Sequence, residues 1–217
     1  MRVVVTAGPT REFIDPVRFL SNPSTGRMGF AVAAEAARCG HDVVLIAGPV
    51  ALPTPKGVSR VDVVSAREMC DAVLSVVGLP DNPTVVVSAA AVADWRPATC
   101  ARKKLKKRHM DGVLNLVRNP DILKRLAGVE RRAGGNLRLV GFAAETGDAV
   151  CEAVRKCREK RLSFIVANDV TEPGAGFGVE TNKVAFVYPD GQVEQLPLMS
   201  KRSVARRIVR QLQHLYP

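Results

Sequence analysis

The sequence predicts an α/β protein with a three-layer, Rossmann-like architecture: a mostly parallel central sheet with helices on both faces, plus a late antiparallel ribbon. Short apolar runs alternate with amphipathic stretches over the first 90 residues. A long Gly- and Pro-rich loop joins the first apolar run to the first amphipathic stretch. Near the C-terminus, two extended segments flank Asp190-Gly191, a two-residue hairpin signal. We expect this ribbon to extend the sheet edge or to make a subunit contact.

The first half of the chain predicts four buried strands and two helices. The strands are expected at residues 3–5, 41–46, 60–64 and 84–87. The first helix is expected at residues 30–39 and ends at Gly40, where a left-handed residue is favoured. The second helix runs through Val77 and begins with a capping box, in which Ser65 precedes Glu68 by three residues. In such parallel sheets, ligands bind at the carboxyl ends of the strands.

The second half continues the alternation before the ribbon interrupts it. Strands are expected at residues 112–117, 137–142, 162–166, 183–188 and 192–198. Helices are expected at residues 148–160 and 200–215. A further helix should begin after Asn119, with Asn119 as its cap, Pro120 at its first helical position and Asp121 on the positive end of its dipole. We treat residues 1–217 as a single domain.

Composition indicates a globular protein with an anionic partner. The 217 residues are 47% hydrophobic and 24% charged, and the formal net charge is +11. This charge favours a nucleic acid or a small phosphorylated substrate, without deciding between them. No apolar run is long enough to span a bilayer and the first residues already form a predicted strand, so no membrane partner and a cytoplasmic location are expected. The five cysteines lack metal or redox spacing and should be reduced.

The stretch from Ser24 to Gly29, Ser-Thr-Gly-Arg-Met-Gly, is a candidate phosphate cradle. Glycines let the backbone approach a ligand, and free N–H groups at a helix start attract anions. A plain strand-to-helix connection would show the same pattern, so this stretch alone leaves both interpretations open. Gly8, Gly26 and Gly29 are too scattered for a dinucleotide fingerprint, and no P-loop sequence is present.

Three further groups could serve either a ligand or the fold. Asp94 adjoins Trp95 and Arg96, which by themselves suit a buried turn with a local ion pair. Residues 102–108 hold six cations, typical of a solvated loop but also of a lid over phosphates. The absence of interleaved aromatic residues disfavours a nucleic-acid patch there. Lys156 and Lys160 share one helix face, an arrangement that is unfavourable unless an anion lies between them.

Eight segments, taken in order, resemble the phosphopantothenoylcysteine synthetase family over nearly the whole chain. They are TAGPTRE from Thr6, DPVRFLSN from Asp15, STGRMG from Ser24, AAVADWRPA from Ala90, KKLKK from Lys103, VRNPDIL from Val117, GFAAET from Gly141 and ANDV from Ala167. The resemblance implies a ligase of coenzyme A biosynthesis that joins 4′-phosphopantothenate to L-cysteine. In the bacterial branch, CTP activates the pantothenate carboxylate as an acyl-cytidylate, and the cysteine amine then displaces CMP. Mg²⁺ bound mainly by phosphates is expected.

The resemblance also assigns residues to this reaction. Asn22 matches an Asn that binds the acyl-nucleotide intermediate, Arg18 matches an Arg tied to the same step, and Lys104 matches a lid Lys that stabilises the transferring phosphoryl group. The triphosphate cradle matches Gly8, Ser24, Gly26 and Gly29. The other nucleotide contacts match Ser88, Ala89, Ala90, Asp94, Pro120, Asp121, Ile122, Leu123, Phe142, Lys156 and Lys160. No metal-ligating protein residue is assigned.

The chain departs from the family pattern at two positions. The flavin-dependent half of the bifunctional members does not lie within these 217 residues, as expected of either a separate synthetase or an excised domain. Ser88 and Trp95 stand where close relatives often carry another small residue and Tyr. Trp95 should preserve the packing of the ring, whereas Ser88 could alter contacts with the base and leaves ATP as an alternative to CTP. The family is dimeric, with the late ribbon at its interface, so a homodimer is expected. A basic nucleic-acid-binding module remains the alternative from another class.

Overall fold

The computed structural model describes residues 1–106, 112–145, 149–169, 174, 176 and 178–216. Its centre is an eight-stranded sheet with the order β13-β12-β10-β9-β6-β1-β4-β5. The strands are β1 (Arg2–Ala7), β4 (Asp42–Ala47), β5 (Val58–Asp62), β6 (Thr84–Ser88), β9 (Leu137–Glu145), β10 (Phe164–Asp169), β12 (Val184–Val187) and β13 (Val193–Gln195). Pairing is parallel from β5 to β10 and antiparallel at β12 and β13. The predicted late ribbon therefore extends the sheet edge.

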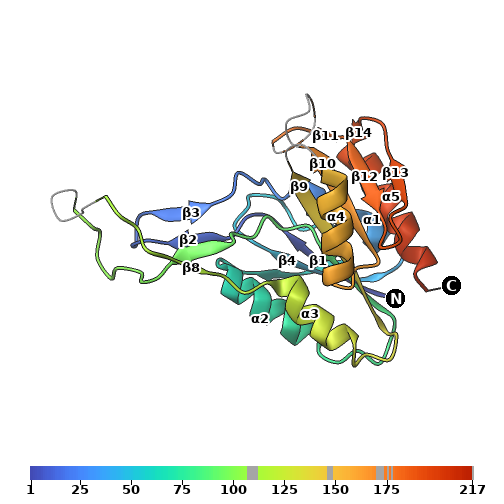
Figure 1. Cartoon of the computed structure of the whole chain (residues 1–217), viewed down its shortest axis with the longest axis horizontal. Coiled ribbons are helices and arrows are strands. Elements are labelled where there is room, and N and C mark those ends of the chain that lie inside the picture. Colours follow the sequence, from blue (N-terminus) through green and yellow to red (C-terminus); the bar gives the residue numbers. More distant parts are fainter. Residues whose placement is uncertain (107–111, 146–148, 170–173, 175, 177, 217) are drawn as a thin grey trace.

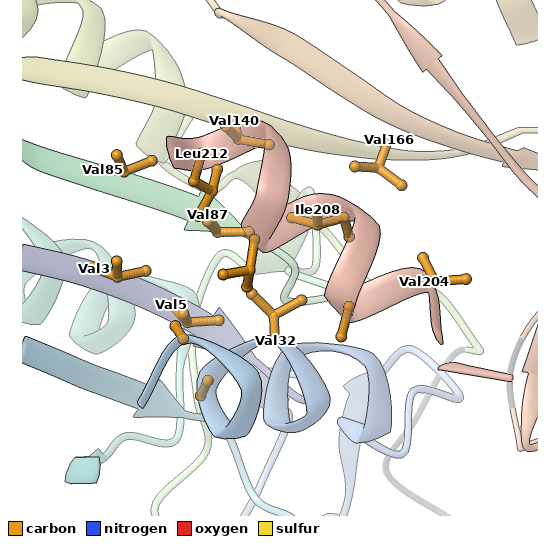
Figure 2. Packing of buried hydrophobic residues seen from close by; sticks show 14 of the residues in the cluster. Val3, Val5, Val32, Val85, Val87, Val140, Val166, Val204, Ile208 and Leu212 are labelled. Carbon is orange, nitrogen blue, oxygen red and sulfur yellow. The ribbon is translucent and has the colours of Figure 1, made fainter. Parts of the chain in front are cut away.

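Helices cover both faces of the sheet, as predicted (Figure 1). Helices α1 (Arg27–Arg38) and α5 (Lys201–His214) pack on one face. Helices α2 (Ala66–Val77), α3 (Ile122–Glu130) and α4 (Ala149–Glu159) pack on the other. Successive side chains of β1 alternate between the two cores: Val3 and Val5 face α1 and α5, and Val4 faces the opposite helices. Figure 2 shows Ile208 and Leu212 of α5 packed over the valines of the sheet. This burial on two faces explains why the strands are apolar throughout.

The order of the strands creates a switch point between β1 and β6. From β1 the chain moves outward through β4 to β5, and then returns to β6 on the other side of β1. The two loops that leave β1 and β6 consequently diverge at neighbouring carboxyl ends. Open α/β sheets bind ligands at such a point.

Two small hairpins form an arm that projects from the sheet (Figure 1). One pairs β2 (Arg11–Phe13) with β3 (Phe19–Ser21), and the other pairs β7 (Trp95–Pro97) with β8 (Leu116–Arg118). A third small ribbon, β11 (Thr181–Asn182) with β14 (Met199–Ser200), leads into α5. The sequence-based prediction missed β2, β3 and β7, because three-residue strands are too short to show a period.

Two sequence-based predictions of local structure are wrong. The strand expected at residues 112–117 is confined to β8, which pairs with β7 away from the central sheet. The cap of α3 is Asp121, whose carboxylate accepts from the Lys124 N–H at 3.0 Å, and not Asn119. Asn119 instead donates its side-chain amide to the Ala93 carbonyl at 2.8 Å. The capping box of α2 is confirmed, since the Ser65 hydroxyl accepts from the Glu68 N–H.

Candidate active site

A cavity of about 640 Å³ lies at the carboxyl ends of the parallel strands. Its wall is built from the loop after β1, the start of α1, the segment after β6, the start of α3, and residues of β7, β8, β9, β10, α4, β11 and α5. The predicted site residues in this wall are Asn22, Ser24, Gly26, Gly29, Ser88, Ala89, Ala90, Asp94, Pro120, Asp121, Ile122, Leu123, Phe142, Lys156 and Lys160. The fold thus gathers residues that lie up to 138 positions apart, from Asn22 to Lys160.

The start of α1 supplies a surface that suits an anion. Gly26 is the N-cap residue and has a φ of 77°, in the left-handed region that favours glycine. No side chain caps the first turn, which leaves its N–H groups available to a ligand. Gly29 lets α1 approach β1 closely, because a Cβ at Gly29 would lie 2.5 Å from the Ala7 Cβ. Gly8 stands behind this turn: a Cβ on Gly26 would lie 3.4 Å from the Gly8 Cα.

Backbone hydrogen bonds join the two diverging loops beneath the cavity. The Ala89 N–H donates to the Thr6 carbonyl at 3.2 Å, and the Ala91 N–H donates to the Gly8 carbonyl at 2.9 Å. The Thr6 hydroxyl accepts from the Ala90 N–H at 3.2 Å. Because Thr6 is almost fully buried, this contact also satisfies a polar group in the core. The segment from Ser88 to Ala91 is therefore held in place by β1.

Asn22 bridges the mouth of the cavity. Its side-chain Nδ2 donates to the Ala91 carbonyl at 3.1 Å and to the Val92 carbonyl at 3.2 Å. These contacts hold the loop after β1 against the loop after β6. The donors of the amide are engaged with backbone, so a ligand carbonyl would have to replace one of these acceptors.

Lys156 of α4 and Lys160, the residue that follows this helix, are each paired with a carboxylate. Lys160 Nζ lies 2.8 Å from Asp121 Oδ2, and Lys156 Nζ lies 3.5 Å from Glu152 Oε1. Partial burial opposes ionisation of Asp121, but Lys160 and the Lys124 N–H outweigh it and hold its pKa below the ordinary value. The carboxylates offset the repulsion that the sequence pattern predicted between the lysines.

Three predicted site residues do not line the cavity: Gly8, Arg18 and Lys104. Arg18 lies on the arm and pairs with Asp15. Lys104 is exposed, and the neighbouring Leu105 is tied to Asp15 and Arg18. The rest of the basic run, residues 107 and 108, lies outside the described residues.

Sequence reasoning missed several residues of the wall, including Arg27, Arg118, Asn119, Asn168, Asn182 and Lys201. Arg27 lay inside the recognised cradle stretch, and Asn168 stands two residues after a predicted strand, so both carried a usable signal. Lys201 begins a helix near the C-terminus, and only the tertiary fold brings it beside α1.

The part of the chain that the model describes contains no cluster of three or more His, Cys, Asp or Glu side chains suited to a metal ion. None of the five cysteines, all of which lie in the described part of the chain, is joined in a disulfide. Of the helices described, none combines the length and apolar character needed to cross a membrane.

Known proteins are similar in sequence to this chain over nearly its whole length. The chain is 47% identical over 211 residues to the coenzyme A biosynthesis bifunctional protein CoaBC of Bacillus subtilis, covering 97% of this chain and 50% of that protein. It is 43% identical over 212 residues to the protein of that name from Escherichia coli K12, covering 96% and 50%. The chain therefore spans about half the length of these relatives.

Solved structures agree with this likeness. The crystal structure of the C-terminal domain of coenzyme A biosynthesis bifunctional protein CoaBC is 41% identical, with a TM-score of 0.80 and coverage of 99% of this chain and 94% of that one. A DNA/pantothenate metabolism flavoprotein from Streptococcus pneumoniae, 22% identical, shows the same fold with a TM-score of 0.81 and coverage of 100% of both chains. Residues 1–216 match the family model described as the DNA/pantothenate metabolism flavoprotein C-terminal domain, and the chain belongs to that family.

Proposed function

We propose that this chain is a phosphopantothenate–cysteine ligase that uses CTP. One observation carries the proposal: apart from Gly8, the residues that the family likeness assigns to nucleotide binding line one cavity at the switch point of the sheet, although they are scattered over the sequence. The match with bacterial coenzyme A biosynthesis proteins supports the same reaction class.

In the first step, the carboxylate of 4′-phosphopantothenate attacks the α-phosphate of CTP. A carbon–oxygen–phosphorus bridge forms, the bond to the β-phosphate breaks, and pyrophosphate leaves. The first turn of α1 and the cations around the cavity stabilise the charge on the phosphates. Because like charges meet in this step, a cationic wall is required, and the net charge of +11 agrees with that requirement.

In the second step, the amine of L-cysteine attacks the acyl carbon. The carbon–nitrogen bond forms, the bond to the nucleotide phosphate breaks, the amine proton passes to solvent, and CMP leaves. We assign to Asn22 the task of donating to the acyl carbonyl, in exchange for one of its contacts with Ala91 or Val92. Lys104 remains a proposed phosphoryl ligand.

We propose that Mg²⁺ enters with the triphosphate. Two carboxylates, Asp94 and Asp121, line the described cavity wall, and Asp121 is already paired with Lys160. Phosphate oxygens and water are the usual ligands of this ion in nucleotide sites, so the residues present fit a phosphate-borne ion. Magnesium would neutralise part of the phosphate charge.

We also propose a homodimer. Twelve large hydrophobic side chains are exposed among the described residues, and seven of them lie on the arm or beside it. These seven are Phe13, Val17, Phe19, Trp95, Val113, Leu116 and Val117. An apolar group of this kind is typical of an interface. The late ribbon, which the family likeness places at the interface, exposes Val193.

The decisive assay mixes the protein with Mg²⁺, 4′-phosphopantothenate, L-cysteine and either CTP or ATP. We expect pyrophosphate and CMP in equal amounts with CTP, and much less product with ATP. Faster turnover with ATP would contradict the choice of nucleotide but retain the ligase. No pyrophosphate with either nucleotide would contradict the function. Salt-sensitive RNA binding in its place would favour the nucleic-acid alternative.

A further inference from the structure

The turn that follows α4 holds Arg161, whose φ of 54° is the one positive value among the described non-glycine residues. The Arg161 N–H donates to the Arg158 carbonyl at 3.3 Å, and the Leu162 N–H donates to the Cys157 carbonyl at 2.9 Å. These two bonds form a Schellman motif, which favours glycine at the position that Arg161 occupies. Because an arginine Cβ is crowded in this conformation, its presence indicates a task for the side chain that glycine could not perform.

The Arg161 side chain joins this turn to the last residue of α3. Its Nε donates to Glu130 Oε2 at 2.6 Å, and the Glu130 side chain is only 16% exposed, so the pair is partly shielded from water. The preceding residue, Lys160, pairs with Asp121, the cap of α3. Two consecutive residues of the turn therefore hold α3 at both of its ends. Helices α3 and α4 cover the same face of the sheet (Figure 1).

The turn and α3 also share an apolar contact on β9. A Cβ placed on Gly141 would lie 2.8 Å from Leu162 Cδ1 and 3.6 Å from Leu123 Cδ1, so both leucines reach the same glycine. Leu162 is buried, and Leu123 lines the cavity. A movement of the turn can therefore be passed to the cavity wall through α3 as well as through Lys160.

The two ion pairs differ in their position relative to the cavity. Lys160 and Asp121 both line it, whereas Glu130 and Arg161 do not. A nucleotide that contacts Lys160 must share this ammonium with Asp121 or displace it. The pair between Glu130 and Arg161 lies outside that exchange, so it can keep α3 and the turn together while the ligand binds.

We propose that Arg161 and Glu130 are positioning residues, which hold Lys160 and the start of α3 in register for the nucleotide. The inference rests on the proposed function. Because neither residue touches the reacting atoms, losing the pair should weaken the ground state and the transition state alike. The KM for CTP should then rise while kcat stays within about twofold of its normal value.

The test compares Arg161→Gly and Glu130→Gln with the wild-type protein. Arg161→Gly removes the ion pair but also relieves the left-handed strain, so its Tm should not fall. The KM for CTP, and the Kd for CTP measured by calorimetry, should rise about tenfold in both variants. Arg161→Lys keeps the charge and should recover part of the affinity.

Glu35→Gln is the matched control for the loss of an ion pair. Arg38 Nη2 lies 2.6 Å from Glu35 Oε1 at the C-terminal end of α1, and neither residue lines the cavity. The KM and Kd for CTP should therefore stay at their wild-type values in this variant. A rise equal to that in Glu130→Gln would show that any lost ion pair weakens the nucleotide, and would overturn the assignment.

A double variant separates positioning from general destabilisation. If Arg161 and Glu130 act as one pair, the two substitutions together should raise the KM no further than either alone. Unchanged KM and Kd in both single variants would overturn the inference and leave the ligase intact, and so would rises that follow a loss in Tm. If the variants bind CTP more weakly but even the wild type releases no pyrophosphate, the positioning role stands and the proposed function fails. A wild-type protein that binds no CTP would contradict both.

Discussion

The guanidinium of Arg18 lies on the buried carboxylate of Asp15, with 2.6 Å between Arg18 Nη2 and Asp15 Oδ2. The same Nη2 donates to the Leu105 carbonyl at 2.8 Å, and the Leu105 N–H donates to Asp15 Oδ2 at 3.1 Å. The pair thus ties the turn between β2 and β3 to the backbone beside Lys104. Arg18, which the family likeness places in the reaction, acts in this chain as an anchor for the segment that carries Lys104.

Replacing Asp15 with Asn should loosen this segment. The amide loses the charge that holds Arg18 and accepts less strongly from the Leu105 N–H. We expect kcat to fall by about tenfold, and trypsin to cleave faster after Lys103 and Lys104. Asp42→Asn is the control, because Asp42 pairs with Arg2 on the surface at 3.5 Å, far from the arm. Unchanged kcat and cleavage in Asp15→Asn would rule out the anchoring role.

The same carboxylate should make stability depend on pH. Hydrogen bonds from the Arg18 side chain and from backbone N–H groups hold the pKa of Asp15 well below its ordinary value. The unfolded chain therefore takes up the proton first, and the stabilisation is lost as pH falls below about 4. Urea midpoints measured from pH 6 to pH 3 should decline more steeply for the wild type than for Asp15→Asn. Parallel curves would show that Asp15 does not contribute.

Sequence patterns predicted the central sheet well, because strands buried on two faces carry long apolar runs and α2 carries a complete capping box. The arm could not be predicted in this way. Its strands have three residues each, and its partners, such as Trp95 and Arg118, are 23 positions apart. The wrong cap at Asn119 has the same origin: an Asn before Pro suits a helix start, but the Ala93 carbonyl from another segment competes for its side chain.

Prediction of the site residues also succeeded where the signal was local in the sequence and failed where it depended on contacts between distant segments. Residues within a local motif, such as Ser24 or Ala89, could be recognised along the chain. Lys201 enters the cavity because α5 packs against α1, a contact between elements some 160 residues apart that no local pattern encodes.

Gly29→Ala tests the close approach of α1 to β1. The added Cβ would lie 2.5 Å from the Ala7 Cβ and 3.0 Å from the Thr6 carbonyl oxygen, so the first turn must shift. We expect a loss of about 1–3 kcal/mol in the free energy of unfolding, and weaker CTP binding. Gly128→Ala in α3 is the control, because its Cβ would meet one atom at 4.0 Å and should raise stability slightly. Unimpaired CTP binding by Gly29→Ala would argue against the cradle.

Asn22→Asp should separate the two chemical steps. The variant should still release pyrophosphate from CTP but form little amide product, because a carboxylate cannot donate to the acyl carbonyl. It also places a negative charge against the carbonyls of Ala91 and Val92, so Asn22→Ala is needed to remove the donor without repulsion. Pyrophosphate and the amide are measured in the same reaction. Normal amide formation by both variants would refute the role of Asn22.

The arm and the late ribbon are the two candidate dimer interfaces, and one charged substitution in each can tell them apart. Val17, in the turn between β2 and β3, is 57% exposed, and Val193 on the ribbon is 37% exposed, so neither substitution by Asp removes core packing. If the arm joins two copies, Val17→Asp buries a carboxylate against apolar side chains and should convert the dimer to a monomer, while Val193→Asp stays dimeric. Sedimentation velocity at several concentrations distinguishes the states. The opposite pattern would place the interface on the ribbon, and a wild-type monomer would contradict the proposed assembly.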